Sequence, residues 1–286
     1  MNAPDRRLNA FRPDLADARL KGRVEAKAFA QGREAVVAAP VADLRSGPSA
    51  DAGLDSQLLA GDAVMVFEER GGWSWVQSAR DGYVGYVPSA ALAAPGAAAT
   101  HLIAVPRSFV YRDADLKSPM LAAHSMGAGV SVADAAETRG TAYARLAGGG
   151  WMIADHLRPA GERSDDFVAV AERLDATPYL WGGASAFGID CSGLVQLAMR
   201  MAGRSVPRDT DMQAGAVGAP LETGGDLSGL RRGDLVFWKG HVAIVQEEDR
   251  IIHANGRTMM VSSDPLAEAV ERIDRIYGRP TGFRRP

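Results

Sequence analysis

Cysteine is almost absent from this chain of 286 residues, which contains only one, Cys191. A single thiol excludes an internal disulfide, and it also excludes a cysteine-rich metal site. No segment has 18 uninterrupted apolar residues, the length that a membrane-spanning helix needs, so we expect no membrane partner. The polar stretch 1–14 also lacks the apolar core of a secretory signal. We therefore expect a cytoplasmic protein with a reduced thiol.

The chain also lacks an excess of charge of either sign. Its 32 Lys and Arg residues nearly balance 35 Asp and Glu residues, the net charge is -3, and there is no basic block. This charge balance does not suggest a nucleic-acid partner. With 47% hydrophobic and 23% charged residues, the composition is that of an ordinary soluble protein, long enough for two or three domains. We expect a monomer without a cofactor.

The first third of the chain changes character near residue 32. Residues 1–31 are polar, and a thin apolar stripe from Asp14 to Phe29 predicts a partly helical arm that docks on a later domain. Residues 32–93 contain short β-rich runs separated by glycine turns such as Gly71-Gly72. This pattern predicts a small all-β barrel or sandwich.

Residues 100–160 repeat this pattern more weakly after a linker at 92–99. Gly129–Val132 aligns with Ala63–Val66, and Gly149–Ile153 stands where Gly82–Val87 stood. Two copies of one small β unit explain the alignment, and two unrelated β modules are the alternative. Both copies resemble bacterial SH3 domains, whose closing strand has a Gly-Tyr/Trp-Val signature.

Residues 161–286 form a domain of another kind. The pattern predicts helices at 164–174, 194–202 and 265–273, a polar loop at 207–230, and strands at 235–238, 241–245, 250–254 and 276–284, with one more possible at 257–261. Helices followed by a run of meandering strands indicate an α+β domain with an antiparallel sheet.

Cys191 lies between a glycine-rich turn and an apolar helical run that ends before Gly203. The N-terminus of a helix presents unpaired N–H groups and a partial positive charge, and both favour a thiolate over a thiol. Cys191 is therefore a candidate nucleophile. A buried, inert cysteine is the alternative.

A thiol nucleophile needs a base, and the chain has only five histidines. Three of them, His101, His124 and His156, lie in the β repeats, whereas His241 and His253 follow Cys191 in its own domain. Adjacent antiparallel strands could bring the last two together, with His241 as the base and His253 as the residue that orients it. The alternatives are structural histidines, or a zinc site formed with Cys191, for which no carboxylate has ligand spacing.

Several motifs in order carry a resemblance to a known family. They are Pro178-Tyr179-Leu180-Trp181-Gly182-Gly183, Gly188-Ile189-Asp190-Cys191-Ser192-Gly193-Leu194, Pro207-Arg208-Asp209-Thr210, Arg232-Gly233-Asp234-Leu235-Val236-Phe237-Trp238, His241-Val242-Ala243-Ile244 and Ile252-His253-Ala254. Together they resemble the NlpC/P60 cysteine peptidases over 165–286. The resemblance implies an α+β, papain-like catalytic domain preceded by two small all-β SH3-like barrels. It also implies cleavage of bacterial cell-wall peptides between γ-D-glutamate and a diamino acid, meso-diaminopimelate or lysine.

The same resemblance assigns roles to residues near the thiol. It implies that Cys191 is the nucleophile, His241 the base and His253 the orienting residue, with the Cys191 N–H in the oxyanion hole. Tyr179 resembles the family tyrosine that donates a second hydrogen bond beside the thiol, with packing under the helix as its other reading. Trp181 would line the same pocket.

SH3-like repeats joined to this domain resemble the γ-D-glutamyl-L-diamino-acid endopeptidases of the dipeptidyl-peptidase VI type. Those enzymes act on free peptides with an unblocked N-terminal L-Ala, and a desolvated ammonium needs carboxylate partners. Asp190 and Asp209 match positions suited to that task, and Ser192 and Thr210 would line the pocket. Asp190 could instead be the N-cap of the helix, and Asp209 an ordinary turn residue.

The first SH3-like repeat matches that subfamily at two further substrate-binding positions. Asp62 stands where the subfamily has Glu, one methylene longer, and Tyr83 matches the second position. Both could equally be ordinary turn and strand residues.

The expected function is therefore a cytoplasmic cysteine endopeptidase for free murein peptides of the form L-Ala-γ-D-Glu-diamino acid, in cell-wall peptide recycling. Two alternatives stay open. One is an exported hydrolase of intact wall with the same chemistry, and the other is a non-catalytic module that binds wall peptides.

Overall fold

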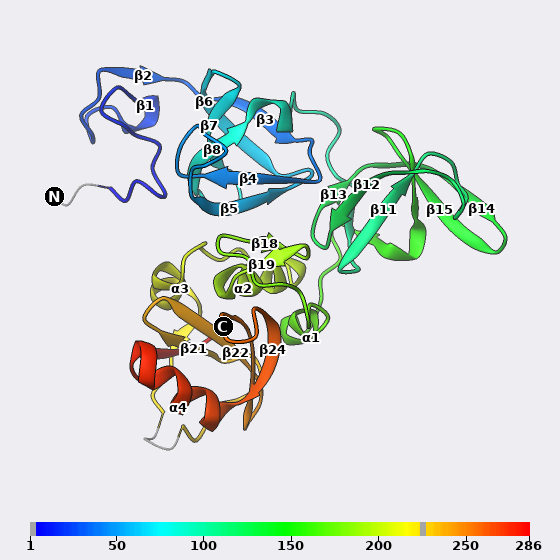
Figure 1. The fold of residues 1–286 in the computed structure, drawn as a ribbon. Helices are drawn as coiled ribbons and strands as arrows, with labels where there is room; N and C mark the ends of the chain where they lie inside the picture. Colours follow the sequence, from blue (N-terminus) through cyan, green and yellow to red (C-terminus); the bar gives the residue numbers. More distant parts are fainter. Residues whose placement is uncertain (1–3, 224–226) are drawn as a thin grey trace. The chain divides into compact units, whose positions relative to one another are not determined.

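The computed structural model describes residues 4–223 and 227–286 and divides into two compact units, one ending at Glu162 and one beginning at Arg163 (Figure 1). Within the described part of the chain, no helix is long and apolar enough to cross a membrane. The first unit consists almost entirely of strands, and the second combines helices with one antiparallel sheet.

The N-terminal arm is not the helix that its apolar stripe predicted. Residues 14–29 contain strand β1 (Leu15–Asp17), a single 3-10 turn at Ala18–Leu20, and the start of β2 (Ala28–Ala30), which pairs with β1 in parallel. Gly22, with φ of 81°, interrupts the pattern just after the 3-10 turn. A stripe with so few buried positions cannot stabilise a longer helix against such a break. Residues 1–3 of the predicted arm lie outside the described residues.

The first β module is a single seven-stranded sheet in the order β5-β4-β8-β7-β6-β3-β9. Its strands are β3 (Arg33–Val37), β4 (Val41–Arg45), β5 (Leu54–Leu59), β6 (Ala63–Arg70), β7 (Trp73–Ser78), β8 (Val84–Pro88) and β9 (Leu92–Ala93). Alternate positions of β4 and β8, including Leu44 and Val87, are fully buried. This is the pattern of a sheet that curls around its own apolar face.

The second β module uses the same strand order as the first. Its strands are β10 (His101–Ile103), β11 (Arg107–Tyr111), β12 (Met120–Ser125), β13 (Gly129–Val130), β14 (Val132–Thr138), β15 (Thr141–Leu146), β16 (Trp151–Ile153) and β17 (Leu157–Pro159). They form sheets of order β13-β10-β17 and β12-β11-β16-β15-β14. The continuous β6 of the first module corresponds to two strands here, because the ladder breaks at Ser131. The repeat proposed from the sequence therefore has a counterpart in topology, and an SH3-like identity for this module stays a prediction.

The second unit contains helices α1 (Phe167–Glu172), α2 (Cys191–Met201), α3 (Thr210–Ala216) and α4 (Leu266–Tyr277). Its sheet has the order β20-β25-β21-β22-β23-β24. These strands are β20 (Ala219–Pro220), β21 (Leu235–Trp238), β22 (His241–Glu247), β23 (Arg250–Asn255), β24 (Met260–Pro265) and β25 (Gly282–Arg285), and a two-stranded ribbon joins β18 (Ala184–Ser185) to β19 (Gly188–Ile189).

Some boundaries in this unit differ from the sequence prediction. The helix predicted at 164–174 begins only after Asp166, whose carboxylate caps it by accepting from the N–H groups of Val168 and Ala169. The helix predicted at 265–273 continues to Tyr277, so the last strand starts at Gly282 rather than at Ile276. The polar loop predicted at 207–230 contains α3 and β20, and its residues 224–226 lie outside the described residues.

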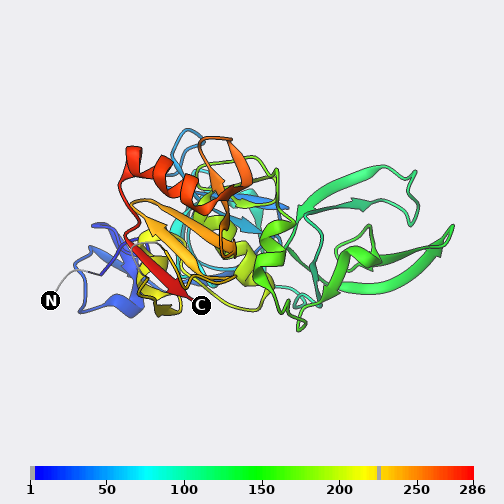
Figure 2. The same ribbon diagram turned by 90° about the horizontal axis from the view of Figure 1, so that it is seen from below.

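Both faces of the central strands are buried. On one face α4 packs Leu266, Ala269 and Ile273 against a cluster that includes Val245 and Ile251 (Figure 2). The alternate residues Val242, Ile244, Ile252 and Ala254 are also buried, and α2 packs against β22 and β23. Because successive side chains of a strand point to opposite faces, α2 covers the face of the sheet opposite α4.

Candidate active site

The glycine-rich turn positions the first residue of α2, Cys191, which is a buried free thiol. Gly182 adopts φ of 75°, a backbone conformation that favours glycine. A Cβ on Gly193, in the first turn of α2, would lie 2.2 Å from the carbonyl oxygen of Gly183. Glycine at these positions therefore lets the start of the helix lie directly against the turn.

Asp190 is the N-cap of α2, which was the alternative reading of this residue. Its Oδ1 accepts from the Gly193 N–H at 2.7 Å and its Oδ2 from the Gly182 N–H at 3.0 Å. The guanidinium of Arg208, 1% exposed, donates to both oxygens, at 3.0 and 2.6 Å. Ser192 donates to Oδ1 at 3.1 Å and accepts from Arg208 at 2.7 Å. Asp190 and Ser192 are thus bound within the protein's own buried polar network, and the sequence reasoning did not identify Arg208 as its centre.

Asp209 and Thr210 begin α3, directly after Arg208. Asp209 is at the N-cap position of this helix without making a side-chain cap hydrogen bond, and both residues are half-buried. Gln213 of the same helix donates to the carbonyl of Ser192 at 3.0 Å. This contact ties the start of α3 to the first turn of α2, so Asp209 and Thr210 are held near the cysteine end of that helix.

His241 and His253 contact each other directly. Nε2 of His241 lies 2.8 Å from Nδ1 of His253, and their ring centres are 5.0 Å apart. The ladder between β22 and β23 runs only as far as the pair Ile244 and Ile252, so both histidines lie beyond its end. The two imidazoles therefore meet where the strands part, which is the level of the α2 N-terminus.

The thiol of Cys191 lies beside the first residues of β22. The N–H groups of Val242 and Ser192 are close enough to lower its pKa, but burial outweighs them and, with the Asp190 carboxylate, raises the pKa of Cys191 to about 12. The helix N-terminus was expected to favour the thiolate, and in the free protein the loss of solvation has the larger effect. Burial also lowers the pKa of His241 to about 3, with contributions from His253 and Arg272. The thiol and the imidazole are therefore both neutral near pH 7.

Asp264 is a third residue of this group, in contact with His253, and the sequence analysis missed it. Its Oδ2 lies 3.1 Å from Nε2 of the buried His253 and also pairs with Arg272 of α4. Arg257 lies 3.7 Å from its Oδ1. Asp264 follows His253 by 11 residues, and only the register between β23 and β24 brings the two together. No local pattern in the sequence marks this contact.

Tyr179 and Trp181 lie differently from each other. Tyr179 is half-buried, and burial raises the pKa of its hydroxyl, with smaller contributions from Cys191 and Asp190, so it lies near both groups. Trp181 is 73% exposed. Trp181 lies in a turn in which the Gly183 N–H donates to the Leu180 carbonyl at 2.9 Å, and this turn directs the Trp181 side chain outward. Trp181 is therefore not packed inside this unit, and its role in lining the substrate pocket stays a prediction.

Asp62 and Tyr83 belong to the first β module, where both have internal contacts. Asp62 is buried, accepts from the Leu59 N–H at 2.8 Å, and pairs with Arg80. Tyr83 is 6% exposed, and Asp81 accepts a hydrogen bond from its N–H at 3.1 Å. These contacts fit the turn and strand roles left open for both residues, and the substrate-binding roles stay predictions.

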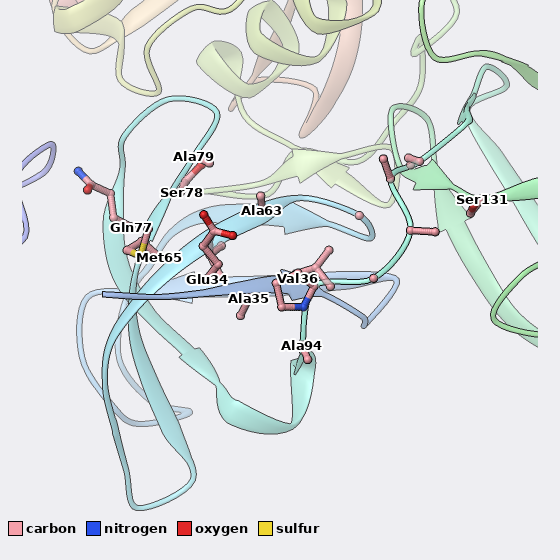
Figure 3. Close-up of a pocket in the computed structure, with 18 of the residues that line it drawn as sticks. Glu34, Ala35, Val36, Ala63, Met65, Gln77, Ser78, Ala79, Ala94 and Ser131 are labelled. Atoms are coloured by element: carbon pink, nitrogen blue, oxygen red, sulfur yellow. The ribbon is translucent and has the colours of Figure 1, made fainter. Parts of the chain in front are cut away.

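A cavity of about 840 Å³ lies in the first unit, between β3, β6, the segment 94–99 and Ser131 (Figure 3). Its lining contains one acid, Glu34, and one base, Arg19, and neither cysteine nor histidine. The cavity therefore contains neither the thiol nor an imidazole that the proposed cysteine chemistry needs.

The zinc alternative finds no support in the geometry. A direct hydrogen bond joins His241 and His253, and the remaining nitrogen of His253 faces Asp264, so these rings do not converge on a common point. Across residues 4–223 and 227–286, no group of three or more His, Cys, Asp or Glu side chains is arranged to hold a metal ion.

Comparison with known proteins agrees with this arrangement. A profile described as the NlpC/P60 family matches residues 176–272, and one described as the bacterial dipeptidyl-peptidase Sh3 domain matches residues 44–92. The chain is similar to dipeptidyl-peptidase 6 of Lysinibacillus sphaericus, with 29% identity over 77% of this chain and 87% of the relative. It is also similar to the γ-D-glutamyl-L-lysine dipeptidyl-peptidase of Bacillus subtilis, with 28% identity over 74% of this chain and 76% of the relative.

A solved structure shares the fold. The crystal structure of an NlpC/P60 family protein from Bacillus cereus superposes with a TM-score of 0.72, covers 88% of this chain and 99% of its own, and is 21% identical. The fold described above therefore also occurs in a solved protein of the NlpC/P60 family.

Proposed function

Because the chain belongs to the NlpC/P60 family, carries a bacterial SH3 domain and is a peptidase, we propose that it is a cysteine endopeptidase of murein peptides. The bond it hydrolyses joins γ-D-glutamate to a diamino acid, meso-diaminopimelate or lysine. Its substrates are free peptides with an N-terminal L-Ala, as in cytoplasmic recycling of cell-wall peptides. The proposal depends most on one observation, that the Cys191 thiol lies beside β22 where His241 and His253 meet.

The mechanism follows from the two neutral groups. His241 Nδ1 removes the thiol proton as the Cys191 sulfur bonds to the γ-carbonyl carbon of D-Glu, giving a tetrahedral oxyanion. The Cys191 N–H and the Tyr179 hydroxyl are our candidates for donors to that oxyanion. The C–N bond then breaks, His241 protonates the leaving amine of the diamino acid, and a thioester remains. Water activated by His241 hydrolyses the thioester and releases L-Ala-γ-D-Glu together with the free thiol.

The substrate class draws its support from the relatives. The names of two of them specify dipeptidyl-peptidases, one with γ-D-glutamyl-L-lysine as its target, and the SH3 profile carries a dipeptidyl-peptidase description. An enzyme that releases a dipeptide must recognise a free N-terminus two residues from the cleaved bond. We assign the ammonium to Asp209, with Thr210 beside it, because both are half-buried at the start of α3, which Gln213 ties to the first turn of α2. Trp181, Asp62 and Tyr83 stay predictions as further substrate contacts.

The test compares L-Ala-γ-D-Glu-meso-diaminopimelate with its N-acetylated form, and each with its lysine counterpart. We expect cleavage of the free peptides only, with release of L-Ala-γ-D-Glu, and loss of cleavage in Cys191→Ala. Equal cleavage of capped and free peptides would refute N-terminal recognition. Release of muropeptides from intact sacculi would instead favour the exported wall hydrolase.

A further inference from the structure

We propose that Asp264 is a positioning residue of this site, and that it fixes the proton positions on His253 and His241 through a single oxygen, Oδ2. Its consequence for catalysis rests on the proposed function, whereas the proton positions themselves are a property of the protein without substrate. The residues concerned lie on three elements, β22, β23 and β24, and are held by a fourth, α4.

Strand register places Asp264 beside His253. In the ladder between β23 and β24, His253 is opposite Ser262 and Ile251 is opposite Asp264. His253 and Asp264 are therefore diagonal neighbours on one face of the sheet, a spacing that side chains can bridge. The bridge is made at 3.1 Å, with His253 1% exposed and Asp264 8% exposed. A buried carboxylate this close to a ring nitrogen strongly constrains which nitrogen carries the proton.

The proton positions follow in sequence from the carboxylate. An ionised carboxylate only accepts hydrogen bonds, so Nε2 of His253 must carry a proton. With one proton on that ring, Nδ1 of His253 is an acceptor. The 2.8 Å contact to His241 must then be donated by Nε2–H of His241. This leaves the lone pair of His241 on Nδ1, the nitrogen that a general base for Cys191 must use.

Arg272 fixes the accepting atom. It donates to the same Oδ2 that receives the His253 proton. The hydrogen bond from His253, together with the positive charges of Arg272 and Arg257, holds the pKa of Asp264 below its usual value despite burial. A guanidinium has no acceptor, so the group facing Arg272 has to be an oxygen.

The charge of Asp264 is already offset by its arginine neighbours. Arg272 pairs with Oδ2, and Arg257 lies 3.7 Å from Oδ1. The carboxylate therefore contributes little electrostatic stabilisation to an imidazolium at His241. Its contribution is the acceptor geometry at Oδ2, and an amide oxygen held by Arg272 should reproduce it.

The direct test reads the histidine tautomers by long-range ¹H–¹⁵N correlation NMR of the full chain without substrate, near pH 7. We expect both His241 and His253 to carry their proton on Nε2. In Asp264→Ala the His253 signals should shift toward a mixture of tautomers, whereas in Asp264→Asn they should keep the Nε2–H pattern. A proton on Nδ1 of either ring in the unsubstituted protein overturns the proposal, as do unchanged signals in Asp264→Ala. That spectrum of the unsubstituted protein decides the matter even where a variant does not fold.

Kinetics with the free tripeptide provide the second measurement. Asp264→Ala should lower kcat about 10- to 100-fold, a loss on the scale of general-base catalysis, and change KM less than about twofold. Asp264→Asn should stay within about threefold of the original kcat because Arg272 orients its amide oxygen. The matched control is Asp274→Ala on the exposed side of α4, where Asp274 pairs with Arg279 at 3.6 Å, and it should leave kcat unchanged.

Failure of the proposed function and failure of the proposed role of Asp264 would give different results. If the tautomers are as expected but the tripeptide is not cleaved, the substrate proposal fails and the role of Asp264 in positioning protons stands. If the tripeptide is cleaved with equal kcat by Asp264→Ala and the unsubstituted protein, the positioning role is refuted while the proposed function stands.

Discussion

The buried pair of Arg208 and Asp190 offers a quantitative test of how the cysteine is held. Asp190 accepts five hydrogen bonds, two of them from Arg208 at 2.6 and 3.0 Å. Replacing Arg208 by methionine removes those two, a third to Ser192 and a longer one to the Gly183 carbonyl. It leaves a carboxylate without a cation at the N-terminus of α2.

The expected loss is large relative to the stability of a domain. Each hydrogen bond to a charged group contributes about 1.5 to 3 kcal/mol, so two give about 3 to 6 kcal/mol. Breaking a buried ion pair from one side costs about 3 to 5 kcal/mol, which agrees. We therefore expect Arg208→Met to lower the free energy of unfolding of the second unit by about 3 to 5 kcal/mol.

The assay is a urea titration read by pulsed hydrogen–deuterium exchange on peptides that cover α2, since these report on the second unit alone. The double variant Asp190→Asn, Arg208→Met removes the unpaired charge and should recover at least about 1 kcal/mol relative to Arg208→Met. A loss below about 1 kcal/mol in Arg208→Met, or a double variant that is no more stable, would refute the reasoning.

Three further predictions concern the second unit, and a fourth concerns Asp62 of the first β module. Because burial raises the pKa of Cys191 to about 12, its alkylation by iodoacetamide should accelerate about tenfold per pH unit from pH 6 to 9, and a rate that is already constant above pH 6 would indicate a preformed thiolate. Gly193→Ala should destabilise the second unit by about 1 to 3 kcal/mol and lower kcat, because its Cβ would meet the Gly183 carbonyl, whereas Gly215→Ala in α3, with no atom within 4 Å, should not destabilise it. Asp209→Asn should raise KM for the free tripeptide about tenfold through the lost ammonium pair, and an unchanged KM would remove Asp209 from substrate recognition. The same measurement on Asp62→Asn decides between its substrate-binding and turn roles.

Local sequence patterns correctly predicted the helix and the two strands that hold Cys191, His241 and His253. The glycines before Cys191 and the apolar run after it predicted a helix that begins near the thiol, and α2 does so. The β-branched neighbours of His241 and His253 predicted two strands, which are β22 and β23. These signals are visible because they depend on neighbours within a few residues along the chain.

The residues that hold this site were not predictable in the same way. Arg208 reaches Asp190 across 18 residues, and Asp264 reaches His253 through the register of two strands. The thiol also differs from its expected state, because helix position is a local property whereas burial depends on the whole domain. The arm at 14–29 shows the opposite failure, in which a local apolar pattern was too thin to determine a helix.

The central claim is that Cys191 forms a thioester with L-Ala-γ-D-Glu. Acid-quenching the full chain within milliseconds of mixing with the free tripeptide, followed by mass spectrometry of its peptides, tests this directly. We expect the peptide that contains Cys191 to gain the mass of the dipeptide less one water, and Cys191→Ala to show neither this adduct nor cleavage. Cleavage that persists in Cys191→Ala, or an adduct on another residue, would contradict the account.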